Sequence, residues 1–150
     1  MIDKIKNLKN FAAFLLEKGH LKEAVHLNIE AAREHHGQII DKLGLHTEKE
    51  INELFTKSFG KFLKDLSINK GFDNILDSFE NWRKNNYNLA ASNIQATDIM
   101  IAFEIRKDVL KRLIPVYTSA IEQSLQLMEE IDTLFFLARK TGMTYLKKVN

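Results

Sequence analysis

Glu23 and His26 are the first residues whose types and spacing could do chemistry. Three positions apart on a helix, they would place a carboxylate and an imidazole on one face, as in di-iron helical bundles. Such sites also need carboxylates from two further helices. We therefore favour a surface coincidence, and a metal-dependent helical-bundle protein is one alternative.

The histidines raise a second chemistry, haem ligation. His35 and His36 are adjacent, so on a helix they would point about 100° apart and could not hold one ion together. His35 falls on a weak apolar stripe, which predicts a partly buried histidine. An all-α chain of this length is globin-sized, and one histidine suffices as the proximal iron ligand. His26 and His46 compete for that role, so a haem- or ligand-binding globin-like protein is the main alternative, and no cofactor is predicted.

Arg106 lies within an apolar stripe that contains Phe103, Leu110 and Leu113. A guanidinium there must reach solvent or be paired, because an unpaired buried charge is costly. The stripe favours a structural ion pair, and a ligand-binding arginine in a sensor pocket is the alternative. The candidates for lining such a pocket are His35, Trp82 and Arg106.

The last predicted helix has apolar residues on more than one face. A face of this kind marks either an interface or a central helix that its neighbours bury all round, and both remain open. Phe135 and Phe136 project in different directions, so a monomer would leave some large apolar side chains exposed unless neighbouring helices cover them. The interface candidates are Leu127, Ile131, Leu134, Phe135, Phe136 and Ala138.

The sequence lacks the motifs of common catalytic sites. It contains no Gly-x-Ser-x-Gly, no glycine-rich phosphate loop and no His-Glu-x-x-His. The absence of cysteine excludes a thiolate zinc site and a cysteine nucleophile. We expect no catalytic residue and a protein that is not an enzyme.

The charge balance argues against two classes of partner. With 22 Lys and Arg against 20 Asp and Glu, the net charge of +2 is too small to indicate nucleic acid or an acidic membrane. No apolar run reaches the roughly 18 residues of a membrane span, and the first residues are not a signal peptide. We expect a soluble, cytoplasmic protein.

These residues must be positioned by helices, since 150 residues contain one proline and no strand pattern. Gly19 should end the first helix, Thr47 and Glu50 form a capping box, and Thr97 is a candidate N-cap. A kink is expected near Gly37, and a kink or break at Pro115. The predicted helices cover 4–18, 21–43, 47–66, 72–89, 97–117 and 119–147. This is a single all-α domain over 1–150, with five or six helices in a globin-like or antiparallel bundle arrangement.

From Phe72 onwards the chain resembles the N-terminal domain of RsbR-type co-antagonists of RsbT, the stressosome sensor subunits. The same helical domain precedes some bacterial sensor histidine kinases. The likeness is carried by Trp82-Arg83, Thr97-Asp98-Ile99, Phe103-Glu-Ile-Arg-Lys107 and Leu125-Gln-Leu-Met-Glu-Glu-Ile-Asp132. It extends more loosely to Leu43-Gly-Leu-His-Thr47 and Phe62-Leu63-Lys64-Asp65-Leu66.

The resemblance implies a helical sensor domain that receives a signal without doing chemistry. It further implies a homodimer that signals through its C-terminal helix to an output domain or protein of the STAS or kinase type. This chain shows no STAS or kinase segment of its own. We therefore expect a non-catalytic sensory input domain of bacterial signal transduction.

Overall fold

The computed structural model of this chain describes residues 5–88 and 94–147, without the side chains of 82–88, 96 and 145–147. Those residues form seven α-helices and no strand, which confirms the predicted all-α class. The helices are α1 (Leu8–Glu17), α2 (Leu21–His35), α3 (Ile39–Lys42), α4 (Glu48–Ser67), α5 (Gly71–Asn88), α6 (Ala96–Tyr117) and α7 (Ile121–Lys147).

The seventh helix arises because the predicted helix over 21–43 is divided. α2 ends at His35, and His36 leaves the helical conformation with φ −146° and ψ 49°. Gly37 follows at the expected kink, and α3 resumes for a single turn. The break turns the chain back over α2 and α4, where it later forms one wall of a cavity.

The end of α1 has the predicted glycine cap. Gly19 has φ +76°, a left-handed conformation that side chains with a Cβ rarely adopt. The N–H of His20 donates to the carbonyl of Leu15 at 2.8 Å, the long bond of a Schellman motif. α1 can therefore reverse into α2 within three residues.

The start of α4 also follows the prediction, with one change of partner. The N–H of Glu50 donates to Oγ1 of Thr47 at 3.1 Å. The Glu50 carboxylate reaches one residue further back than in the simplest capping box and accepts from the N–H of His46 at 3.1 Å.

One expectation about the ends of α6 is wrong. Its N-cap is Gln95 rather than Thr97, because Asp98 in the first turn accepts from the N–H of Gln95 at 2.7 Å. Of the kink or break expected at Pro115, the break does not occur, since Pro115 lies in the last turn and α6 continues to Tyr117.

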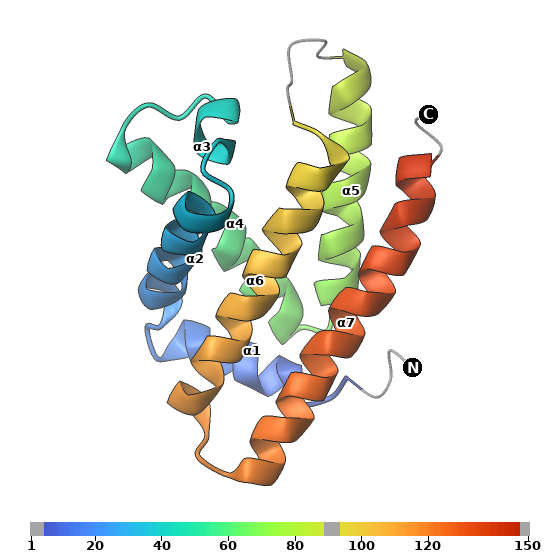
Figure 1. Cartoon of the computed structure of the whole chain (residues 1–150). Helices are drawn as coiled ribbons and strands as arrows, with labels where there is room; N and C mark the ends of the chain where they lie inside the picture. Colours follow the sequence, from blue (N-terminus) through green and yellow to red (C-terminus); the bar gives the residue numbers. More distant parts are fainter. Residues whose placement is uncertain (1–4, 89–93, 148–150) are drawn as a thin grey trace.

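The helices form two groups that share α6 (Figure 1). On one side, α2 packs against α4 and α6, while α1 crosses below and packs mainly on α4. On the other, α5 and α6 both pack against α7. Aromatic rings link α1 to the end of α6: the Tyr117 ring lies 5.4 Å from Phe11 and 5.0 Å from Phe14, centroid to centroid. α6 packs against helices of both groups, and α4 also packs against α5.

The packing of α7 corrects most of the interface prediction. Five of the six candidates are buried inside this chain, against α5 and α6: Leu127, Ile131, Leu134, Phe135 and Ala138. Phe136 is the exception, with 53% of its surface exposed. It shares one side of α7 with other exposed apolar residues, Ile121, Leu125, Met128 and Met143. Single-sequence periodicity could not distinguish burial within the chain from burial between chains.

Candidate functional site: a cavity between α2, α3, α4 and α6

The described part of the chain contains a cavity of about 490 Å³. It lies where α2, α3 and α4 face α6, and Ser78 of α5 also lines it. Most of its wall is apolar, with a few polar groups, which is the usual composition of a small-molecule site. The lining residues are Asn28, Ala32, His36, Ile39, Leu43, Leu54, Phe55, Ser58, Ser78, Ile94, Asp98, Ile99, Ala102, Phe103, Ile105 and Arg106. Leu43, Leu54 and Ala102 are exposed, so the cavity opens to solvent beside them.

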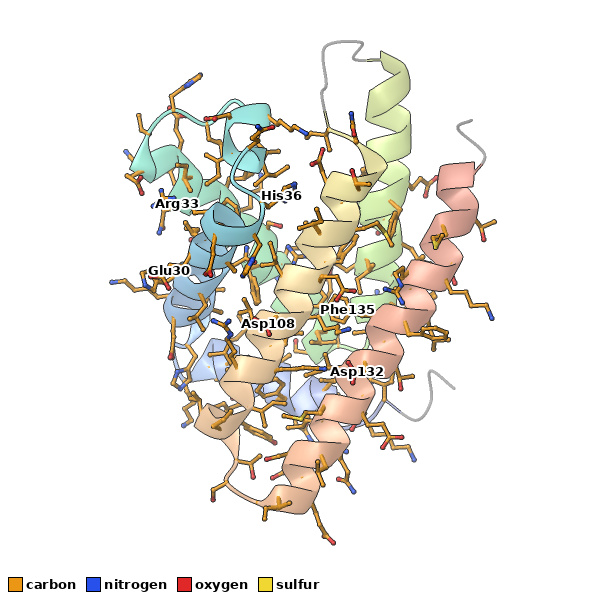
Figure 2. All side chains as sticks on the ribbon, in the orientation of Figure 1. Glu30, Arg33, His36, Asp108, Asp132 and Phe135 are labelled. Carbon is orange, nitrogen blue, oxygen red and sulfur yellow. The ribbon has the colours of Figure 1, made fainter. Side chains whose placement is uncertain are left out.

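One end of the cavity is closed by a cluster of charged groups around Asp98. His36 Nε2 lies 2.8 Å from Asp98 Oδ1, and Lys42 Nζ donates to Oδ2 at 3.0 Å. In Figure 2, His36 lies between the end of α2 and the start of α6. Burial alone would raise the pKa of Asp98, but hydrogen bonds from His36, Gln95 and Lys42 outweigh it and lower the pKa to about 2. Asp98 is therefore a carboxylate at neutral pH, already paired within the protein.

Arg106 lies further along α6 on the same wall. Its Nη2 donates to Oγ of Ser58 at 3.0 Å. Its guanidinium carbon lies 4.9 Å from the ring centroid of Phe62 and 5.5 Å from that of Phe59, both cation–π distances. Burial lowers the pKa of Arg106 to about 10, which leaves the group charged at neutral pH. The expected ion pair is absent: no carboxylate among the described residues lies within salt-bridge distance of Arg106.

Asn28 on α2 is the third polar group of the wall. Only 7% of its surface is exposed, and its amide makes no hydrogen bond to any described residue. α2 and α6 run antiparallel beside each other, and the end of one meets the start of the other at His36 and Asp98. Asn28 lies eight residues before His36 on α2, and Arg106 lies eight residues after Asp98 on α6. These two side chains therefore line the cavity at about the same level, roughly 12 Å from Asp98.

The structure places the predicted pocket residues differently. Arg106 lines the cavity, as the alternative interpretation proposed. His35 does not, because its side chain is 59% exposed on the outside of α2, so the expectation of a partly buried His35 is wrong. Its neighbour His36 is the buried one, at 9% exposure. The side chain of Trp82 is not among those that the structure describes. Asn28 was visible only as a polar interruption of the α2 stripe.

The residues proposed for metal and haem ligation do not converge. Glu23 lies beside His20 at 3.4 Å, and His26 pairs instead with Glu30 at 3.1 Å. His26 and His46 are exposed, and neither lines the cavity. Among the side chains that the structure describes, no three His, Asp or Glu residues are grouped as metal ligands would be.

The comparisons with known proteins add no assignment. No family model matches the chain, and neither does any curated protein or solved structure. Within the described ranges, no helix is both long enough and apolar enough to cross a membrane. The function must therefore be argued from the cavity itself.

Proposed function

We propose that this chain is a non-catalytic sensory module that binds a small molecule in the cavity and passes the signal on through α6 and α7. The observation that carries the proposal is the cavity: about 490 Å³, largely apolar, and lined by a few polar side chains from α2, α4, α5 and α6. That size falls within the range of small-molecule sites. The resemblance to RsbR-type sensor domains supports a cytoplasmic, signalling role for such a site.

The position of α6 supports the signalling part of the proposal. Asp98 and Arg106 face the cavity, whereas the other side of α6 packs against α7. Lys111 Nζ on α6 lies 2.7 Å from Asp132 Oδ1 on α7, and Arg139 on α7 donates to Glu104 on α6 at 3.4 Å. A ligand that favours one position of α6 would therefore change the packing of α7, provided that it binds two arrangements with different affinity.

The exposed side of α7 supports the partner that the proposal needs. Phe136, Leu125 and Ile121 present apolar surface along this helix, with Met128 and Met143 between and beyond them. Surface of this kind is typical of an interface. We assign it to a second copy of this chain or to an output protein of the STAS or kinase type.

The cavity is tested with N-phenyl-1-naphthylamine, an uncharged dye that fluoresces in apolar surroundings. We expect saturable binding to the parent protein and a loss of at least tenfold in affinity for Ala102→Phe, which fills the mouth. Ala120→Phe, a matched exposed alanine outside the lining, should bind like the parent. Equal binding by both variants would show that the dye does not use the cavity.

Transmission is tested on the same samples by hydrogen exchange. Dye binding should slow exchange in α7 as well as in the helices that line the cavity. Protection confined to α2, α3, α4 and α6 would contradict a signal that passes to α7.

A further inference from the structure

Resting on the proposed function, we infer that the ligand is an organic monoanion, a carboxylate on a compact apolar body, whose carboxylate binds Arg106 and Asn28. Three observations carry the inference: the charge balance of the wall, the free donors of Arg106, and the amide of Asn28. The first two concern Arg106, and the third is independent of them.

The charge balance of the wall is positive. Of the described residues that line the cavity, Asp98 is the one carboxylate, and Lys42 already neutralises it. Arg106 is paired only with the neutral hydroxyl of Ser58 and with two aromatic rings. One positive charge is therefore left without a counter-charge in an apolar setting, where an anion is the partner that offsets it best.

The unused donors of Arg106 face the open space. Nη2 is engaged with Ser58, while Nε and Nη1 have no hydrogen bond to a described residue. No polar side-chain atom in the described, unexposed residues is both closed off from solvent and without a partner. These two nitrogens must therefore be accessible to water or to a ligand. Ser58 and the rings of Phe59 and Phe62 hold the guanidinium in place, so binding need not order a flexible arginine.

Asn28 supplies a second, independent sign of a ligand. It is more than nine-tenths buried, lines the cavity and has no described partner for its amide. Because no closed-off side-chain polar atom of the described residues lacks a partner, the amide of Asn28 must be open to the cavity, where a ligand can pair it. Since it lies at the level of Arg106 on the facing helix, its Nδ2 can donate to the same carboxylate. Donors from two helices then bind one anion.

The rest of the wall indicates what the carboxylate is attached to. Apart from Arg106, Asn28, the Asp98 cluster and the hydroxyls of Ser58 and Ser78, the lining is apolar and includes Ala32, Ile39, Leu43, Leu54, Phe55 and Ile99. Such a wall favours an apolar body and excludes a second charged group. A monocarboxylate fits the wall better than a phosphate or a dicarboxylate.

The test compares two ligands of the same shape, one with a carboxylate and the other with an uncharged amide in its place. 1-Naphthaleneacetate and 1-naphthaleneacetamide have the same rings, so titration calorimetry of each with the full chain isolates the contribution of the carboxylate. We expect the acetate to bind at least tenfold more tightly, because a charge-assisted hydrogen bond replaces a neutral one. Arg106→Met and Asn28→Leu should each reduce this preference, and Arg106→Met should abolish it.

Arg112→Met is the matched control, since Arg112 lies on the same helix but pairs with Asp108 at the surface. It should retain the preference of the parent. Because the preference is first measured on the parent, the test stands even if a variant fails to fold. An acetate that does not bind, or binds no better than the acetamide, overturns this inference. The dye experiment decides separately whether the cavity binds ligands at all, so the two failures are distinguishable.

Discussion

Asp98 and His36, 62 positions apart in sequence, meet at 2.8 Å in the interior and join the start of α6 to the end of α2. Lys42 and the N–H of Gln95 complete the surroundings of the carboxylate. Asp98→Asn should therefore cost about 1–3 kcal/mol at pH 7, because an amide cannot accept from all three donors. Urea unfolding at pH 7 measures this loss.

The same group predicts a dependence on pH. The pKa of Asp98 is about 2 in the folded protein, below its usual 3.8, so the carboxylate stabilises the fold above the unfolded value. That contribution is lost as the pH falls through the window between these two values. The difference in unfolding free energy between parent and Asp98→Asn should shrink across it. Asp108→Asn removes an exposed ion pair with Arg112, so its unfolding free energy should differ little from that of the parent at every pH. A constant gap for Asp98→Asn would contradict the assignment.

Glu130 on α7 should be worth more to stability than a typical surface glutamate. It is 7% exposed and accepts from the N–H and Nδ2 of Asn7, both at 2.7 Å, and from the N–H of Leu8 at 3.3 Å. It thereby places a negative charge at the positive end of α1. We expect Glu130→Gln to cost about 1–3 kcal/mol in chemical unfolding. Glu129→Gln, an exposed neighbour, should change stability by no more than about 0.5 kcal/mol.

Gly142 and Gly60 should respond in opposite directions to alanine. A Cβ at Gly142 would lie 2.5 Å from the ring of Phe79, too close without movement of α5 or α7. Gly142→Ala should therefore destabilise the protein by about 1–3 kcal/mol. At Gly60, inside α4, the nearest atom to an added Cβ is a Leu21 methyl carbon at 3.4 Å. Gly60→Ala should be neutral or stabilise by up to about 1 kcal/mol through helix propensity. Thermal unfolding of both variants checks the contrast.

The exposed side of α7 predicts self-association. In sedimentation velocity, the parent should shift from monomer to dimer as concentration rises. Leu125→Lys with Phe136→Lys should remain monomeric, because a desolvated charge opposes association. Gln126→Lys serves as the control, since Gln126 is exposed on the same helix about 100° around from Leu125. A parent that stays monomeric at its highest soluble concentration would leave this side of α7 to an output protein instead.

The helices and most of their ends were predictable because their signals are local. Gly19 and Thr47 act through hydrogen bonds to residues within a few positions, and the sequence shows those residues directly. The N-cap of α6 was misplaced because Thr97 is the better capping residue type. The side chain of Asp98, reaching back to Gln95, instead sets the helix start.

The cavity was less predictable, because its polar groups are defined by distant partners. Arg106 was identified as a lining candidate because it interrupts the apolar stripe of its helix. Its hydrogen bond to Ser58 could not be predicted, because Ser58 lies 48 residues away in the sequence. His35 was preferred to His36 because an unbroken α2 was assumed. The non-helical backbone at His36 places the second histidine inside instead.

The contact between Asn7 and Glu130 also bears on how the protein is made. It joins residues 123 positions apart, so the amino end of α1 cannot obtain its cap until α7 has been translated as far as Glu130. At about 5–20 residues per second, that delay is roughly 6–25 seconds. During this time the first helix to leave the ribosome depends on α4 alone for most of its burial. A nascent chain stalled before residue 130 should therefore expose α1 to chaperones and proteases, and full protection of α1 should come only with the final helix.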